Sequence, residues 1–222
     1  ELQTNYEARL SRYATLLHAT EPPGLVAKLA IYRQLLRQRE IHGEKLWKIE
    51  PMLYPLMHSA EIDLHLAAAR LLEDPGRSEG SIFAFLKFCV TNRTHITWKA
   101  GTPPAETFDE QVARLEAHRA TITAIMGRRD KFFAHLDKRY FREPERIYVD
   151  FPLEDSAVIA LVNVVIAIIT EHQWKLRETA NFHVAECCEI GVDNMVRNLE
   201  AGRRQNFQGQ LRAYQNVCSH RF

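Results

Sequence analysis

Hydrophobic residues recur at steps of three and four along most of the chain, which is the spacing of one face of an α-helix. The clearest stripe consists of Leu53, Met57, Ala60, Leu64, Ala67 and Leu71. Pro51 and Pro55 mark its first turn, and the run Asp74-Pro75-Gly76 ends it. This pattern predicts a helix over residues 52–73 that packs against other helices.

The same periodicity predicts helices elsewhere in the chain. A second stripe begins near Phe108 and stops at Gly127, and a long apolar helix is expected over 153–175. Further helices are expected over 5–18, 25–49, 81–91 and 182–199, the last ending before Gly202. The stretch 147–151 lies between two prolines and is expected to be briefly extended.

These elements predict an all-α helical bundle. The chain shows no internal repeat, low-complexity tract or clear inter-domain linker. Residues 1–50 are interpreted as an N-terminal helical extension, and residues 51–222 as one compact helical domain.

Composition places the chain among ordinary globular proteins. Of its 222 residues, 46% are hydrophobic and 26% are charged. The formal net charge is only +1, so any contact with RNA has to come from a local basic patch. The apolar run 157–169 is shorter than the ~20 residues of a bilayer span, and we expect a soluble, cytoplasmic protein.

Two groups of residues in the chain contain side chains that can bind metal ions. The four cysteines form no C-x-x-C pair, so buried thiols explain Cys187 and Cys188 beside His183 better than zinc does. On the 52–73 helix, His58, Glu61 and His65 share one face. They are interpreted as a metal site, as the lining of a cleft, or as ordinary polar positions, and no cofactor or metal is expected.

The segment with the most chemistry is Gly127-Arg-Arg-Asp-Lys-Phe-Phe-Ala-His-Leu-Asp-Lys138, named here the Arg/His segment. An arginine neutralises phosphate charge, and a histidine transfers protons near neutral pH. Together they form a minimal set of groups for cleaving RNA without a metal. Arginine–histidine pairs at this spacing also arise by chance, for example Arg12 with His18, so the surrounding residues carry the assignment.

Arg129, Asp130 and His135 resemble the Arg-x4-6-His signature of the HEPN superfamily, and their surroundings resemble its abortive-infection AbiU-type branch. The similar region extends over about 52–199 and includes the helix end Ala69-Arg-Leu-Leu-Glu-Asp74. The resemblance implies a HEPN-like bundle and an antiparallel homodimer with a shared cleft. It also implies a metal-independent endoribonuclease of a toxin–antitoxin or antiviral system, with RNA as substrate and an antitoxin or regulator as a further partner.

Within this resemblance, Arg129, His135 and Asp130 are the expected catalytic residues. Residues seven apart share a helix face, which would pair Arg128 with His135, but Gly127 is expected to break the helix and so favours Arg129. The residues expected to contact phosphate are Arg128, Lys131, Lys138 and Arg139, with Arg142 and Arg146 continuing the basic flank.

Two points of regulation and function stay open at this stage. Some HEPN toxins are modified on a tyrosine two residues after the histidine, but that position is Asp137 here, and the nearest tyrosine is Tyr140. The basic and aromatic tail from Arg203 to Phe222 is interpreted as an RNA contact or as a packed terminus. The competing functions are a non-catalytic HEPN module that binds RNA, nucleotide or protein, and an interaction-only bundle.

Overall fold

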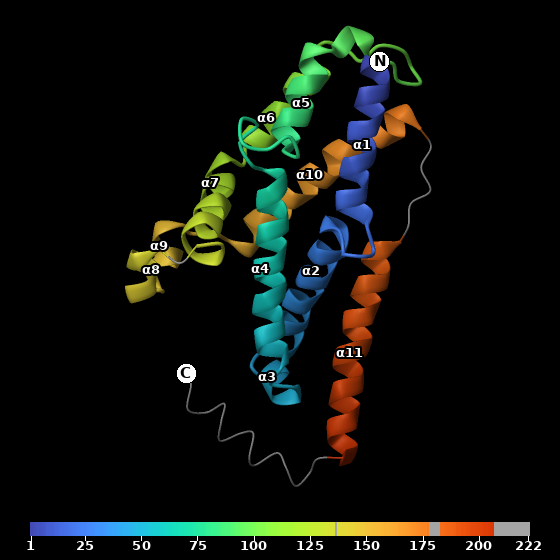
Figure 1. Cartoon of the computed structure of the whole chain (residues 1–222). Helices are drawn as coiled ribbons and strands as arrows, with labels where there is room; N and C mark the ends of the chain where they lie inside the picture. Colours follow the sequence, from blue (N-terminus) through green and yellow to red (C-terminus); the bar gives the residue numbers. More distant parts are fainter. Residues whose placement is uncertain (136, 178–182, 207–222) are drawn as a thin grey trace. The chain divides into compact units, whose positions relative to one another are not determined.

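The computed structural model describes residues 1–135, 137–177 and 183–206, and these are helical almost throughout (Figure 1). Within these ranges the chain forms eleven α-helices, a 3-10 helix at Arg93–His95 and a π-helix at Arg129–Phe133. Extended pairing in the described ranges is limited to one isolated bridge between Trp98 and Gly101. The predicted all-α class is confirmed.

The described residues divide into two compact units. The first comprises residues 1–26 and 65–177, and the second comprises 27–64 and 183–206. This division differs from the boundary expected near residue 50. The reason is that α1 (Leu2–His18) packs against α10 (Asp155–Leu176) within the first unit, through a buried stripe made of Tyr6, Leu10, Tyr13 and Leu17.

The second unit contains most of α2 (Leu25–His42), α3 (Lys45–Ile49), the first part of α4 (Leu53–Leu71) and α11 (Val184–Asn206). The helix expected over 25–49 is interrupted at Gly43, whose φ of 54° is left-handed and suits glycine. Helix α11 runs through Gly202 instead of ending before it.

The core of the second unit joins α3, α4 and α11. It consists of Leu46, Ile49, Leu53 and Val196, with Trp47, Met195 and Leu199 packed against them. A polar contact adds to this packing, because the side-chain amides of Gln34 and Gln38 both donate to Asp193, the second at 2.6 Å. The second unit is therefore held by its own apolar core and by a shared acceptor on α11.

The first unit contains the remaining helices: α1, the end of α4, α5 (Ile82–Thr91), α6 (Thr107–Glu116), α7 (Arg119–Arg128), α8 (Lys138–Arg142), α9 (Arg146–Asp150) and α10. The single helix expected from 107 to 126 is two helices, because the chain turns at Ala117 and His118. The expectation of an extended stretch over 147–151 is wrong. Residues 147–150 lie in the one-turn helix α9, in which Ile147 is buried.

The centre of the first unit is a fully buried histidine that sequence reasoning did not identify. The His172 ring lies among Phe85, Trp98 and Phe108. Its Nδ1 lies 2.8 Å from the Tyr6 hydroxyl, and its Nε2 lies 2.9 Å from Gln111 Oε1. Because the amide oxygen only accepts, Nε2 carries the proton and Nδ1 accepts from the tyrosine. Burial and then the charge of Lys175 lower the pKa of His172 to about 3, so the ring is neutral.

Helix α10 is long and apolar enough, by composition, to cross a membrane, with 22 residues and a mean hydropathy of 1.6. It is the one such helix among the described residues. Seven of its side chains are buried in the first unit, including the hydrogen-bonded His172, and Glu171 forms an ion pair with Arg114 at 2.7 Å. These are features of a core helix, and the described residues contain no clear membrane span.

Candidate functional site

The Arg/His segment lies where helix α7 changes its geometry. Helix α7 continues without a break into the π-helix Arg129–Phe133, in which the backbone N–H of Ala134 donates to the Arg129 carbonyl at 2.8 Å. This bond spans five residues instead of four. π-turns of this kind occur at the C-terminal ends of helices. The helix then ends, and Ala134 and His135 form a bend.

Gly127 does not break the helix, so the expectation that it ends α7 is wrong. Its role is close packing. A Cβ atom at this position would lie 2.1 Å from Cε1 of the Phe151 ring and 2.2 Å from its Cδ1. Residue 127 is therefore a glycine because the ring that follows α9 presses against the α7 backbone.

The two arginines of the segment have different environments. Arg128 is buried, with 4% of its surface exposed, and its Nε donates to the Phe151 carbonyl at 2.9 Å. Its guanidinium carbon lies 4.9 Å from the centre of the Tyr148 ring. This placement attaches α9 to α7 and argues against Arg128 as a phosphate ligand.

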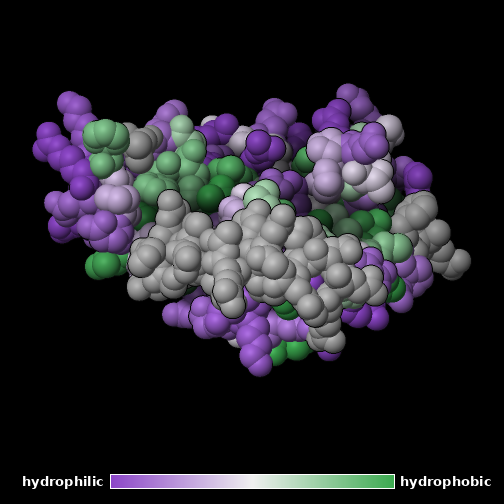
Figure 2. Space-filling model, turned by 90° about the horizontal axis from the view of Figure 1, so that it is seen from below, coloured by the Kyte–Doolittle hydropathy of each residue, from purple (hydrophilic) through white to green (hydrophobic). Residues whose placement is uncertain are grey.

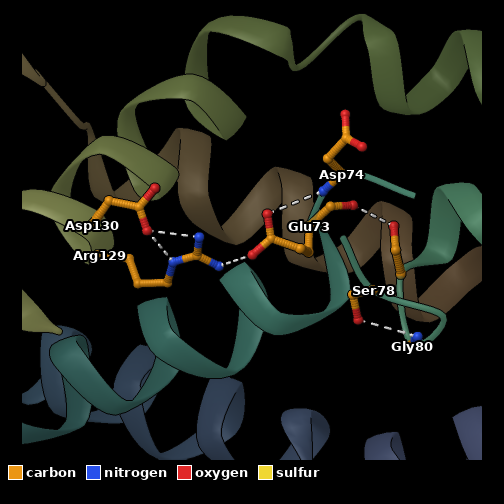
Figure 3. Close-up of polar contacts among 7 residues, drawn as sticks. Glu73, Asp74, Ser78, Gly80, Arg129 and Asp130 are labelled. Atoms are coloured by element: carbon orange, nitrogen blue, oxygen red, sulfur yellow. Dashed lines mark hydrogen bonds and ion pairs between the residues drawn. The ribbon is translucent and has the colours of Figure 1, made fainter. Parts of the chain in front are cut away.

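Arg129 is held between two carboxylates (Figure 3). Its Nε and Nη2 both lie 2.7 Å from one oxygen of Asp130, and its Nη1 donates to Glu73. The Arg129 and Glu73 side chains are only 16% and 15% exposed. Burial lowers the pKa of Arg129, but the hydrogen bonds that it donates to Glu73 and Asp130 outweigh burial and raise the pKa. Arg129 is therefore a fixed, permanently charged group.

Glu73 was not singled out as a site residue from sequence, although it belongs to the helix end used for the family resemblance. It lies just beyond α4, and its carboxylate also accepts the backbone N–H of Asp74 at 3.2 Å. Its carbonyl accepts the hydroxyl of Ser81, the residue that caps α5 by accepting from Phe83 N at 3.2 Å. The end of α4, the start of α5 and the π-helix thus meet at Glu73.

A groove of about 460 Å³ opens beside this cluster. Its apolar lining includes Leu72, Phe83, Ile122 and Met126. Its charged lining consists of Glu73, Asp74, Glu116, Asp130, Arg77 and Arg119. Acidic groups outnumber basic ones, so this groove is not suited by charge to hold phosphate, but it opens onto the two carboxylates that hold Arg129.

His135 is exposed, directly after the π-helix. The turn around it is closed by the Asp137 backbone N–H, which donates to the Lys131 carbonyl at 3.0 Å. Neither ring nitrogen forms a hydrogen bond or ion pair with the part of the chain that the structure describes. The imidazole is therefore accessible at the end of the helix that carries Arg129, and no hydrogen bond joins these two residues within one chain.

The other residues expected to contact phosphate lie near the surface. Lys131 is half exposed and 3.8 Å from Asp137, and Lys138 is exposed. Arg139 forms an ion pair with Asp150 at 3.1 Å. Residue 137, the position of the modified tyrosine in some HEPN toxins, is an Asp that caps α8 by accepting from Arg139 N at 3.0 Å. Tyr140 is buried and donates to Asp150 at 3.0 Å.

The face expected to hold His58, Glu61 and His65 together is not a joint site. His58 is nearly half exposed and lies 3.5 Å from Glu61. His65 is buried, its ring centre lies 6.3 Å from that of Phe133, and its Nδ1 has no partner within the described ranges. Burial and then the charge of Arg128 lower its pKa to about 4. His65 therefore supports the π-helix as a neutral ring.

The remaining candidates add no joint site in the described ranges. His183 pairs with Glu186 at 3.2 Å, Cys187 is exposed, and Cys188 is half-buried. Among the residues that the structure describes, no group of three His, Cys, Asp or Glu side chains is arranged to hold a metal ion. Most of the basic and aromatic tail, including Phe207, Tyr214 and Phe222, lies outside the described residues.

Comparison with known proteins adds one finding. A family model described as AbiU2, of the HEPN type, matches residues 9–187. The match begins within α1, so most of the first fifty residues, expected to be an appended extension, lie inside it. Searches of curated proteins and of solved structures each gave no significant match. The match identifies a family and leaves the roles of Arg129 and His135 to be argued from their geometry.

Proposed function

Because the chain belongs to the AbiU2 family of HEPN proteins, we propose that it is a metal-independent endoribonuclease that acts as a toxin or abortive-infection effector. One observation carries this proposal. The π-helix holds Arg129 rigidly between Glu73 and Asp130, and the next bend of the chain presents the exposed imidazole of His135. A fixed cation and an accessible proton carrier thus lie at the same helix end.

Arg129 keeps donors for a substrate even while both carboxylates hold it. A guanidinium has five N–H groups, and the contacts with Asp130 and Glu73 use three of them. One N–H on each terminal nitrogen remains to donate to phosphate oxygens. The carboxylates therefore orient the guanidinium, and the substrate phosphate binds its outer edge.

His135 supplies the proton transfers. RNA carries its own nucleophile, and removal of the 2′-OH proton lets that oxygen attack the adjacent phosphorus. Protonation of the departing 5′-oxygen then releases the downstream strand. The products are a 2′,3′-cyclic phosphate and a 5′-OH end. The charge that develops on the phosphoryl oxygens is stabilised by Arg129.

One chain offers a single exposed histidine in the Arg/His segment, whereas the reaction needs a base and an acid. A second copy related by a two-fold axis beside His135 supplies the other group. We therefore include a homodimer in the proposal. Mixing His135→Ala chains with Arg129→Ala chains tests this arrangement. No cleavage by the heterodimer means that both Arg/His segments must be complete, as a two-histidine site requires, and partial recovery means that one intact His135 and one intact Arg129 from different copies suffice in part.

The test of the activity is the chemistry of the product ends. Wild-type protein is incubated with 5′-labelled single-stranded RNA in the presence of a chelator. Fragments that carry a 2′,3′-cyclic phosphate support the proposal, and fragments that carry a 3′-OH or appear only with added metal contradict it. A growth-arrest assay on expression of the chain accompanies this measurement, since a toxin is expected to halt growth only when His135 is intact.

A non-catalytic HEPN module is the second candidate. It is favoured by the surplus of negative charge around Arg129, since two carboxylates oppose one guanidinium. Such a module would bind RNA, nucleotide or protein without cutting. Binding of labelled RNA with no fragments, and growth arrest that is independent of His135, would select it.

A further inference from the structure

The short helix α8 presents an unusual face to solvent. Lys138, Phe141 and Arg142 occupy positions i, i+3 and i+4, so their side chains leave the helix on the same side. Phe141 is 72% exposed, and both cations are exposed. An exposed aromatic ring flanked by two cations can stack on a nucleic-acid base while the cations bind phosphates, which an isolated exposed apolar residue cannot do. These three residues are named the α8 face.

The opposite side of α8 is anchored, so the exposure of Phe141 is not a fraying effect. Tyr140 is buried, its hydroxyl donates to Asp150 at 3.0 Å, and its ring centre lies 6.4 Å from that of Phe151. Arg139 reaches the same carboxylate at 3.1 Å. Helix α8 therefore has one side fixed to α9 and the other directed to solvent.

This pair of helices is fixed to the helix that carries Arg129. The Phe151 ring presses on the Gly127 backbone, and Arg128 donates to the Phe151 carbonyl. Arg128 also lies over the Tyr148 ring, which is itself 57% exposed. In Figure 2, hydrophobic surface appears among hydrophilic surface at the left edge of the view, where α8 and α9 lie.

The local charge favours a polyanion. Residues 127–142 contain six Arg or Lys side chains and two carboxylates, a net charge of +4, compared with +1 for the whole chain. The nearby acid Asp150 is occupied by Arg139, Arg146 and the Tyr140 hydroxyl. Lys138 and Arg142 have no partner within the described part of the chain, so both are available to phosphates.

We propose that the α8 face is a docking platform for single-stranded RNA, with a base stacked on Phe141 and flanking phosphates bound by Lys138 and Arg142. Single strands present unpaired bases to an aromatic ring, and duplexes do not. The platform deepens the proposed ribonuclease function, because the contacts of Gly127 and Arg128 with Phe151 hold it beside the Arg/His segment. It gives the enzyme a substrate contact outside the acidic groove.

The test measures RNA binding separately from cleavage. The full chain carrying His135→Ala is titrated into a fluorescent single-stranded 12-mer RNA, and anisotropy is recorded. Adding Phe141→Ala is expected to weaken binding about tenfold, while Phe141→Trp preserves it within about twofold because stacking is retained. The matched control is Trp174→Ala, which removes an exposed aromatic side chain from a different helix, α10, and is expected to leave binding unchanged.

Salt dependence tests the two cations. The double change Lys138→Ala with Arg142→Ala is expected to reduce the slope of log affinity against log salt by about 1.4, since each single-strand phosphate contact contributes about 0.7. Equal slopes, or equal affinity after Phe141→Ala, would overturn the platform. If Phe141→Ala instead converts a dimer into a monomer with RNA affinity unchanged, this face is an interface between copies.

The two proposals fail in different ways. RNA binding that depends on Phe141, with no cleavage by the wild-type chain, sinks the ribonuclease function and leaves the platform standing. Cleavage that needs His135, with RNA binding indifferent to Phe141 and to the Lys138 and Arg142 pair, sinks the platform alone.

Discussion

The carboxylate of Glu73 and the guanidinium of Arg129 form an ion pair that joins the end of α4 to the π-helix (Figure 3). The pair is largely shielded from water, so its geometry is well defined and its loss is costly. In the proposed ribonuclease, the pair would also set which part of Arg129 is open to the substrate. Glu73 would then be a positioning residue that acts on cleavage through Arg129.

Replacement of Glu73 by Gln should separate binding from catalysis. The neutral amide removes a charge-assisted hydrogen bond, which lowers the free energy of unfolding by about 1–2 kcal/mol. Cleavage is expected to fall about tenfold or more because Arg129 loses its orientation. RNA affinity is expected to hold or rise, because one opposing carboxylate charge has gone. Glu79→Gln, at an exposed site, is the control. A variant that cuts RNA as fast as wild type would show that Arg129 needs no positioning by Glu73.

The two adjacent arginines should fail differently. Arg129→Ala is expected to abolish cleavage in a folded protein, and Arg129→Lys to restore little, because a point charge does not present two parallel donors. Arg128→Ala is expected to destabilise the fold by about 2 kcal/mol, through loss of the buried contacts with Phe151 and Tyr148. The measurements are thermal unfolding and cleavage by the folded fraction. If the Arg128→Ala variant were stable but inactive while the Arg129→Ala variant remained active, Arg128 would be the arginine needed for cleavage.

Gly127→Ala tests the close contact with Phe151. The added methyl group would overlap the ring, so we expect a loss of about 1–3 kcal/mol in stability by thermal unfolding. Gly191→Ala in α11 is the matched control. A Cβ there meets nothing within 4 Å, and the change should be neutral or stabilising. Combining Gly127→Ala with Phe151→Ala should remove the overlap, and a double variant no better than additive would contradict this packing.

The helical class and most element positions could be predicted from periodicity, because the apolar stripe on α4 is long and regular and similar spacing recurs along the chain. The errors share a cause. Gly127 was interpreted as a helix breaker, but its role depends on Phe151, 24 residues later, and no local pattern reveals that contact. Residues 147–150 lie in helix α9 because Ile147 packs into the core, against the local expectation from two flanking prolines.

The candidate site was predictable in part. The composition of the Arg/His segment marks it in the sequence. The preference for Arg129 over Arg128 stays a prediction, and the helix break used to argue for it does not exist. Glu73 is 56 residues away from Arg129, so its contact could not be read from spacing. Nor could the buried network of His172, since the residues around it come from three other helices and a loop.

Stability should fall in mild acid because two histidines are buried in neutral form. Burial lowers the pKa of His172 to about 3 and that of His65 to about 4. Histidine in an unfolded chain titrates near ~6.5, so below that pH the unfolded state binds more protons and is favoured. The contribution of the two neutral rings to the free energy of unfolding is therefore fully present above pH ~6.5 and decreases as the pH falls below it.

For His172 alone the loss between pH 7.5 and pH 5 is about 2 kcal/mol. His172→Gln is expected to lower stability at pH 7.5 but to reduce the further loss on acidification by about that amount, measured by chemical denaturation at both pH values. His95→Gln, at an exposed position, should leave the loss unchanged. An equal acid loss in both variants would mean that His172 is not buried as a neutral ring.

If His135 and Arg129 of this chain cleave RNA, the rate of cleavage by His135→Ala has to fall. Wild type, His135→Ala and the exposed control His95→Ala are compared on one labelled single-stranded RNA in chelator, at matched folded concentration. Loss of a general acid–base group is expected to slow cleavage by about 10²–10⁴-fold, with His95→Ala equal to wild type. Cleavage by well-folded His135→Ala within about threefold of wild type would remove His135 from the mechanism.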